Sequence, residues 1–226
     1  MGFIVLRADL HIHSNVSDGE LSPENIVFYA IKKRLHVISI TDHNSFRGSI
    51  RARNYVKSRQ LPIVIIIGSE VRTSKGDVLI LCSELPSKYP PLNNVCEIYE
   101  YAESNSCIAI PAHPYDVLRS GIATYTTRCK WHAIEAFNAS ASLLSNIYAY
   151  KISLRLNLPK IASSDAHVEE LIGWYYTLID SEPNPEEVLD AIRKGKVRMV
   201  IKYLTLKHRA YQVSWSIKKF LRSLFH

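Results

Sequence analysis

The sequence predicts an α/β barrel that forms a single domain. Apolar segments of strand length alternate with helical segments along the whole chain. This alternation is typical of parallel β-α-β units, and about seven such units can be counted. The length of 226 residues suits one small or incomplete barrel spanning residues 1–226. A doubly wound open sheet is the alternative fold, because it shows the same alternation.

The first half of the chain carries clear start signals for its elements. Ser22-Pro23-Glu24 places a capping hydroxyl, a proline and an acidic residue at the beginning of a helix. The β-branched run 61–67 indicates a fully buried strand. The strands expected here cover 4–10, 37–41, 61–67 and 78–82, and the helices cover 22–34, 48–59 and 93–105. We expect the last two of these strands to pair across a turn at 73–77.

The second half continues the pattern. Pro185-Glu186-Glu187 combines a proline and acidic residues, as in a helix's first turn. The strands expected here cover 108–112, 133–137, 160–163, 175–179 and 197–206, and the helices cover 140–156, 185–194 and 211–225. The final helix lies in a basic segment, 208–226, which we expect to pack on the barrel. Contact with RNA or an acidic membrane surface is the alternative role for this segment.

Composition and charge narrow the class of protein. No run approaches the roughly 20 apolar residues of a membrane helix. Arg7 and Asp9 interrupt the early apolar run, so no secretory signal is predicted and we expect a cytoplasmic protein. The four cysteines lack C-x-x-C spacing, which argues against zinc ribbons and favours free buried thiols. The net charge of +7 favours polyanionic partners such as nucleic acid or nucleotides.

Histidines and acids that could bind metal follow the predicted strands. They lie in Asp9-Leu10-His11-Ile12-His13 with Asp18 in the next loop, Thr41-Asp42-His43-Asn44, Gly68-Ser69-Glu70, Ala112-His113-Pro114 and Ser164-Asp165-Ala166-His167. An extended backbone points His11 and His13 the same way, because they are two residues apart. In a parallel barrel all strand carboxyl ends open on one face. The sequence therefore predicts that these five segments converge.

The chemistry of this set points to divalent metal ions. Asp18, Glu70 and Asp165 would repel one another strongly without cations between them. Imidazole and carboxylate together suit Zn, Mn or Fe, and carboxylates also suit Mg. About eight ligands exceed the four that one tetrahedral ion takes, so two or three ions are expected. Their surplus positive charge would attract phosphate and lower the pKa of a bound water.

At these motifs the chain resembles the polymerase and histidinol phosphatase (PHP) family. The similarity runs in order from residue 8 to residue 167, about two-thirds of the chain. It implies a distorted (β/α)7 TIM-like barrel with up to three metal ions. By this resemblance the first ion is held by His11, His13, Glu70 and Asp165, the second by Glu70 and His113, and the third by Asp18, His43 and His167.

Some positions depart from the family's pattern or lie outside it. Asp77 is the best-placed residue where the family usually supplies one more ligand, often a histidine, so the second ion's coordination is open. Asn44 stands where the family usually has an aspartate. Asp42 is expected to orient an imidazole rather than to bind metal. The histidines that match no motif, and are expected to be ordinary, are His36, His132, His208 and His226.

The resemblance implies hydrolysis of phosphate esters of nucleotides or short nucleic acid by a metal-bridging hydroxide. Arg119 is the candidate phosphate clamp, since a guanidinium can hold two phosphate oxygens. Glu135 could be a metal ligand, a hydrogen-bond acceptor behind one, or a contact to a substrate hydroxyl. A small-metabolite phosphatase of the histidinol-phosphate type is one alternative function. A non-catalytic RNA-binding subunit is the other, and it would not need a full ligand set.

Overall fold

The computed structural model describes residues 5–202 together with residues 210 and 214. The expected helix 211–225 and most of the basic segment 208–226 therefore lie outside the described residues. In chain order the elements are β1 (Val5–Ile12), α1 (Pro23–Lys32), β2 (Val37–Ile40), α2 (Arg47–Arg59), β3 (Val64–Thr73), β4 (Gly76–Cys82), α3 (Glu97–Ser104), β5 (Cys107–Pro111), α4 (Tyr125–Arg128), β6 (Ile134–Asn138), α5 (Leu143–Arg155), β7 (Lys160–Ser163), β8 (Tyr176–Asp180), α6 (Pro185–Arg193) and β9 (Val197–Val200). None of the described helices is long and apolar enough to cross a membrane.

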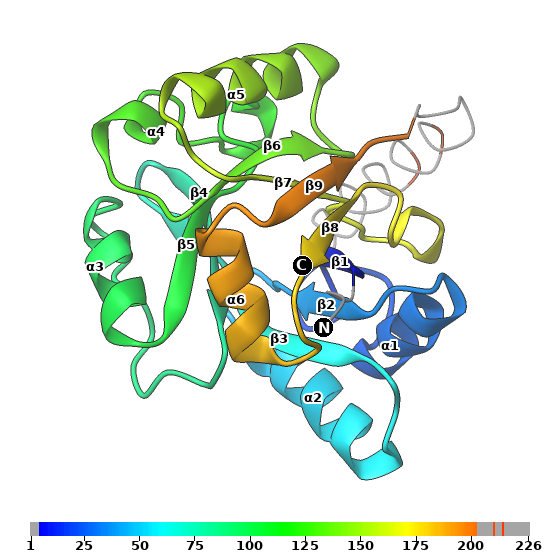
Figure 1. Ribbon diagram of the computed structural model, residues 1–226. Helices are drawn as coiled ribbons and strands as arrows, with labels where there is room; N and C mark the ends of the chain where they lie inside the picture. Colours follow the sequence, from blue (N-terminus) through cyan, green and yellow to red (C-terminus); the bar gives the residue numbers. More distant parts are fainter. Residues whose placement is uncertain (1–4, 203–209, 211–213, 215–226) are drawn as a thin grey trace, which may run out of the picture.

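The strands curl into a distorted barrel (Figure 1). A seven-stranded sheet runs in the order β5-β4-β3-β2-β1-β8-β9, and β6 and β7 form a separate parallel pair. The end of β1 reaches the segment after β7, where Ile12 bridges Ala166. On the other side, the His132 amide before β6 donates to the Ala109 carbonyl of β5 at 3.1 Å. The β6–β7 pair thus lies between β5 on one side and β1 on the other. The barrel prediction is confirmed, and the open-sheet alternative is wrong.

Not every neighbouring pair of strands is parallel. β4 runs antiparallel to both β3 and β5, and β8 runs antiparallel to β1. The β3–β4 pairing was expected from the turn at 73–77, and the structure pairs Thr73 with Gly76 there. The short hairpin leaves no room for a crossover helix, so a parallel arrangement is excluded. As a consequence the start of β4 lies beside the end of β3, and Asp77 is on the same rim as Glu70.

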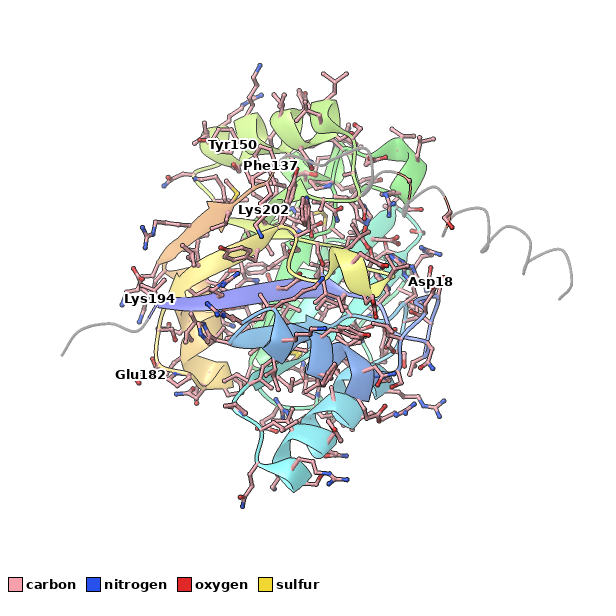
Figure 2. All side chains as sticks on the ribbon, turned by 90° about the vertical axis from the view of Figure 1, so that its right-hand side faces the viewer. Asp18, Phe137, Tyr150, Glu182, Lys194 and Lys202 are labelled. Carbon is pink, nitrogen blue, oxygen red and sulfur yellow. A yellow bond between two sulfur atoms is a disulfide. The ribbon has the colours of Figure 1, made fainter. Side chains whose placement is uncertain are left out.

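One helix closes the barrel at the end away from this rim. The side chains of Val188, Leu189 and Ile192 on α6 are buried and belong to the same apolar cluster as the barrel interior. The interior residues of that cluster are Leu6, Ala8, Leu10, Val37, Ile66, Leu79, Leu81, Ile108, Ile110, Ala112, Ala133, Ile161 and Ile179. Figure 2 shows Asp18 on the opposite side of the molecule from Lys194, the residue that ends α6. The candidate metal ligands therefore lie at the end of the barrel opposite α6.

The outer faces of the sheet are covered by the remaining helices. α1 and α2 pack on β1–β3 through one apolar cluster, and α3 packs on β4 and β5 through another. Figure 1 shows α5 above β6, on the far side of the barrel from α2. Short elements absent from the sequence prediction are α4 and the 3-10 turns Val117–Arg119 and Glu169–Leu171.

The four cysteines form two disulfides, so the expectation of free thiols is wrong. Cys82 pairs with Cys107 between neighbouring strands β4 and β5, and Cys96 pairs with Cys129 between the loop before α3 and the end of α4. Spacing in sequence misses these pairs, because antiparallel pairing and loop packing bring distant positions together. Cysteine content consequently gives no support to a reducing compartment.

Reduction of the disulfides is expected to destabilise the fold. The two bonds close loops with sequence separations of 25 and 33 residues. Loop-closure entropy suggests that each contributes about 3–4 kcal/mol. Unfolding by guanidinium should therefore shift to lower denaturant in the presence of a phosphine reductant. In a Cys96→Ser/Cys129→Ser variant the reductant should lower the unfolding midpoint by less, because only one disulfide remains to be reduced. A midpoint that changes neither with reductant nor with this substitution would contradict the pairing.

Candidate metal centre

The polar side chains predicted at the strand ends meet at the open rim of the barrel. Five triplets of His, Asp and Glu side chains each place three possible ligand atoms within 4.8 Å of one another. The members of these triplets are His11, His13, Asp18, His43, Glu70, Asp77, His113, Asp165 and His167. All are buried except Asp18 and His43, which are partly exposed. The structure thus brings together every residue that the sequence proposed as a ligand.

An irregularity in β1 aims its two histidines at the interior. Leu6, Ala8 and Leu10 belong to the interior cluster, whereas Ile12 belongs to the outer cluster beneath α1. The pairing with β2 shifts register between Asp9 and Ile12. A shift of this kind reverses the alternation of side chains, so that the odd-numbered residues face inward at the strand end. His11 and His13 therefore point into the centre together.

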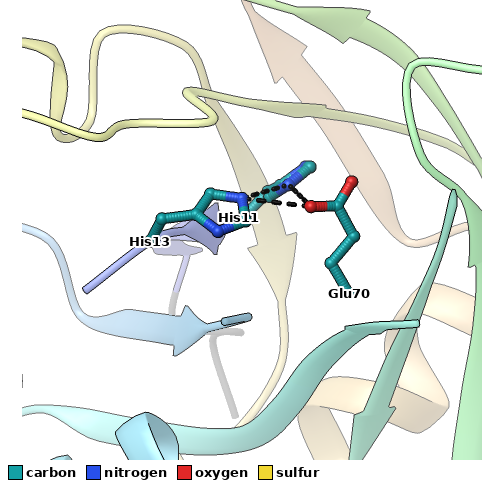
Figure 3. Close-up of side chains that lie close together, drawn as sticks. All are labelled: His11, His13 and Glu70. Carbon is teal, nitrogen blue, oxygen red and sulfur yellow. Dashed lines mark hydrogen bonds and ion pairs between the residues drawn. The ribbon is translucent and has the colours of Figure 1, made fainter. Parts of the chain in front are cut away.

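The Glu70 carboxylate contacts several imidazoles, and Figure 3 shows it facing His11 and His13. Its Oε2 atom is 3.4 Å from His11 Nε2, 3.2 Å from His13 Nε2 and 3.1 Å from His43 Nδ1. Its Oε1 atom is 2.9 Å from His113 Nε2. One carboxylate thus touches four imidazoles that come from three different strand ends. This geometry suits a carboxylate shared between two ions.

A second group gathers around Asp18 on the loop after β1. Asp18 Oδ1 is 3.3 Å from His167 Nε2 and 3.5 Å from His13 Nδ1, and its Oδ2 is 3.6 Å from His43 Nε2. Asp165 links this group to the first, because its Oδ1 is 3.4 Å from His13 Nε2 and 3.6 Å from His11 Nε2. The two groups form one continuous cluster.

Glu135 is placed behind the histidines rather than at the opening. Its carboxylate is fully buried, and its Oε1 accepts a hydrogen bond from His11 Nδ1 at 3.0 Å. Its Oε2 accepts from the His113 amide at 2.7 Å and from Asn138 Nδ2 at 3.0 Å. The bond to His11 fixes the tautomer that leaves Nε2 free to bind metal. These bonds fit the role of an orienting acceptor, and the roles of metal ligand and of substrate contact stay predictions.

Asp42 does not orient an imidazole directly, contrary to expectation. Its Oδ1 accepts from the Ser14 amide at 2.8 Å and from Ser17 Oγ at 2.7 Å, and its Oδ2 accepts from Ser14 Oγ at 2.7 Å. These bonds anchor the loop that carries Asp18. Gly48 leaves the necessary space, since a Cβ there would lie 1.9 Å from Asp42 Oδ2.

Arg119 faces the cluster, as its predicted role requires. Its Nη1 donates to Asp165 Oδ2 at 2.9 Å, and about a quarter of its side chain, 24%, is exposed. Asn138 Nδ2 donates to the same oxygen at 3.3 Å. Asp165 has a positive φ of 50°, a region that Asp and Asn enter more readily than other side chains with a Cβ. The guanidinium is therefore within reach of both the cluster and the opening.

Asp77 lies on the same rim, where it forms an ion pair with Arg72. Arg72 is its direct cross-strand partner, and Arg72 Nε and Nη2 donate to Asp77 Oδ1 and Oδ2, both at 3.1 Å. Asn44 supports this pair, because its Oδ1 accepts from the Arg72 amide at 2.8 Å. Nothing in the sequence pattern marked Arg72 as part of the site.

Two further residues, Asp9 and Asn138, hold the cluster together, and no role was predicted for either of them. Asn138 contacts Glu135 and Asp165, as described above. Asp9 accepts from the Ser164 amide at 3.1 Å, from Ser164 Oγ at 2.6 Å and from the Gly173 amide at 2.8 Å. An aspartate inside an apolar strand was the signal available in the sequence, and the structure buries this residue fully. Asp9 ties β1 to the segment that carries Asp165.

The unmatched histidines lie away from the centre where the structure describes them. His36 Nδ1 accepts from the Arg7 amide at 2.9 Å. His132 Nδ1 accepts from the Ala109 amide at 3.0 Å, and its Nε2 contacts Glu103. His208 and His226 fall outside the described residues.

The pKa values of the carboxylates and imidazoles in the cluster depend strongly on one another. Burial alone would lower the pKa of His13, but Asp165 and Glu70 raise that pKa to about 10. Burial opposes ionisation of Asp165, yet His11 and Arg119 hold its pKa well below the usual range. Imidazolium charge therefore compensates the buried carboxylates when no cation is bound. Divalent cations would supply that charge instead.

The donor set fits divalent metal ions. The set comprises five imidazoles and four carboxylates, and these are the ligand types that Zn, Mn and Fe share. The Nδ1 atom of His113 is buried and makes no hydrogen bond within the described part of the chain. A buried ring nitrogen without a hydrogen bond is costly unless something else binds it. The Glu135 contact also leaves His11 Nε2 open, as metal ligation requires.

Comparison with known proteins gives a consistent picture. A family model described as PHP-associated matches residues 144–197. An uncharacterised protein of Methanocaldococcus jannaschii is 29% identical over 162 residues, which is 65% of this chain and 91% of that protein. A 5'-3' exoribonuclease of Salmonella typhimurium is 37% identical over 65 residues, but these are 29% of this chain and only 22% of the relative. A two-domain protein of Bacteroides vulgatus containing a predicted PHP-like metal-dependent phosphoesterase superposes with a TM-score of 0.72 at 21% identity, covering 88% of this chain and 66% of that structure.

The fold and the centre define an α/β barrel with a His/Asp/Glu cluster at its open rim. The matched family model covers residues 144–197, and the structural similarity shows that the chain has a PHP-like fold.

Proposed function

We propose that this protein is a metal-dependent phosphoesterase that hydrolyses phosphate esters of nucleotides or short nucleic acid. The observation that carries the proposal is the convergence of five imidazoles with Asp18, Glu70 and Asp165 on one largely buried cluster at the open rim of the barrel. The partial similarity to exoribonucleases supports a nucleic-acid substrate, and so does the net charge of +7.

The chain's own residues would divide the work as follows. His11, His13, Glu70 and Asp165 would hold one ion, His113 with Glu70 a second, and Asp18, His43 and His167 a third. Bound ions would lower the pKa of water and neutralise charge that develops on phosphorus. Arg119 would orient the phosphate, because its guanidinium has donors besides the one on Asp165. Glu135 and Asn138 would keep the histidines and Asp165 in place.

The alternatives are weaker in this geometry. A non-catalytic RNA-binding subunit has no need of a largely buried ligand cluster in which Glu135 orients His11. A small-metabolite phosphatase would use the same cluster, and only the substrate separates it from our proposal. A cytoplasmic location stays a prediction, to be tested by imaging a fluorescent fusion in the native host.

The proposal is tested with purified protein stripped by a chelator and then supplied with Mn²⁺, Zn²⁺, Fe²⁺ or Mg²⁺. Nucleoside monophosphates, nucleoside bisphosphates, 5'-phosphorylated RNA and histidinol phosphate are offered in parallel. We expect hydrolysis that needs a metal and prefers the nucleotides or RNA. Hydrolysis of histidinol phosphate alone would establish the metabolite phosphatase. Absence of metal-dependent turnover, together with tight binding of structured RNA, would favour the binding subunit.

A further inference from the structure

The Arg72–Asp77 ion pair stands at the edge of the metal centre and has no place in the ligand assignments. Asp77 is buried, and one of its oxygens lies within 4.8 Å of ligand atoms of His43 and Glu70. Arg72 is about half exposed, at 49%, and binds both oxygens of that carboxylate. The guanidinium of Arg72 thus binds the carboxylate that would complete a metal-binding triplet with His43 and Glu70.

Contacts to neighbouring segments hold both residues of this ion pair in place. The backbone of Asp77 is fixed, because its amide donates to the Ser120 carbonyl at 2.8 Å. The Arg72 amide is held by Asn44. Two parallel hydrogen bonds between guanidinium and carboxylate form the strongest common geometry for such a pair. A divalent ion at Asp77 would lie beside a fixed positive charge and would compete for the same oxygens.

We propose that Arg72 competes with a divalent ion for Asp77, and so keeps one position of the centre at low affinity. The inference rests on the metal centre of the proposed function, but not on any reaction. In the wild-type protein Asp77 acts as the partner of Arg72 and contributes little to the bound ions. Removal of Arg72 releases Asp77 as a ligand. Arg72 is therefore a positioning residue that sets how many ions the centre holds.

Metal titration without substrate tests this assignment. The chelator-stripped protein is titrated with Mn²⁺, and free ion is followed by electron paramagnetic resonance while bound metal is counted by mass spectrometry. Arg72→Met should bind its weakest ion at least about tenfold more tightly than the wild type, because a neighbouring positive charge is gone. Arg72→Lys, which keeps the charge but loses the two-point contact, should fall between them. Asp77→Asn in the wild-type background should leave the number and affinity of tightly bound ions within about twofold.

Two controls make the result specific. On the surface, Arg51 Nη2 donates to both carboxylate oxygens of Glu24, so Arg51→Met should leave metal binding unchanged. In the double variant Arg72→Met/Asp77→Asn the gain should disappear. Unchanged or weaker binding in Arg72→Met would overturn the proposal. So would the loss of a tightly bound ion in Asp77→Asn, which would make Asp77 an ordinary ligand. Both results are independent of whether the protein hydrolyses any phosphate ester.

Discussion

Replacing Asp165 by Asn is expected to reduce metal-dependent hydrolysis by roughly 10³-fold or more. Asp165 Oδ1 lies beside His11, His13 and His167, so one substitution removes a negative charge from both groups of the cluster. Asparagine retains the positive φ of 50° and the shape of the side chain, whereas alanine would strain the backbone. The loss should therefore reflect metal binding rather than folding.

The measurement pairs turnover with metal content. Asp165→Asn should lose bound metal and should no longer gain melting temperature on addition of Mn²⁺, since an ion stabilises only the state that binds it. His36→Gln is the matched control, because His36 lies away from the centre and its ring accepts a hydrogen bond from the Arg7 amide. Our assignment fails if His36→Gln inactivates the protein while Asp165→Asn stays active.

Replacing Asp9 by Ala is expected to cost about 3–5 kcal/mol of folding stability. The carboxylate accepts three hydrogen bonds, two from backbone amides and one from Ser164 Oγ, and it is fully buried. Its loss would leave the amides of Ser164 and Gly173 without a partner in the interior. It would also release β1 from the segment that precedes Asp165.

Denaturant unfolding with and without metal measures this effect. Ser164→Ala removes only the hydroxyl bond and should cost about 1 kcal/mol, which separates the hydroxyl from the buried amides. Asp9→Ala should also weaken metal binding, because the position of Asp165 depends on this anchor. A stability change below that of Ser164→Ala would contradict the role we give to Asp9.

Much of this arrangement could be predicted from local sequence patterns. Strand ends are marked by a change from β-branched residues to His, Asp or Glu, and these signals placed His11, Glu70 and Asp165 correctly on one rim. The pattern is local, since it depends only on the two-residue period of a strand and on where that strand stops. Helix starts at Pro23 and Pro185 were equally local, and the structure agrees with both.

The remainder depends on contacts between distant segments. The disulfide partners, the pairing of Arg72 with Asp77 and the closure of the barrel by α6 follow from packing that no local pattern encodes. The register shift in β1 is a further example, because it appears only in the pairing of Asp9 and Ile12 with β2. Asp42 shows the same limit: its partners, Ser14 and Ser17, are 28 and 25 residues away in sequence.

The position of α6 has a consequence for how a substrate reaches the cluster. Val188, Leu189 and Ile192 fill the end of the described barrel opposite the cluster. A substrate would therefore approach the cluster from the open rim, and its products would leave on that same side. For the substrate that we propose, this arrangement favours binding at the end of a strand over passage through the barrel.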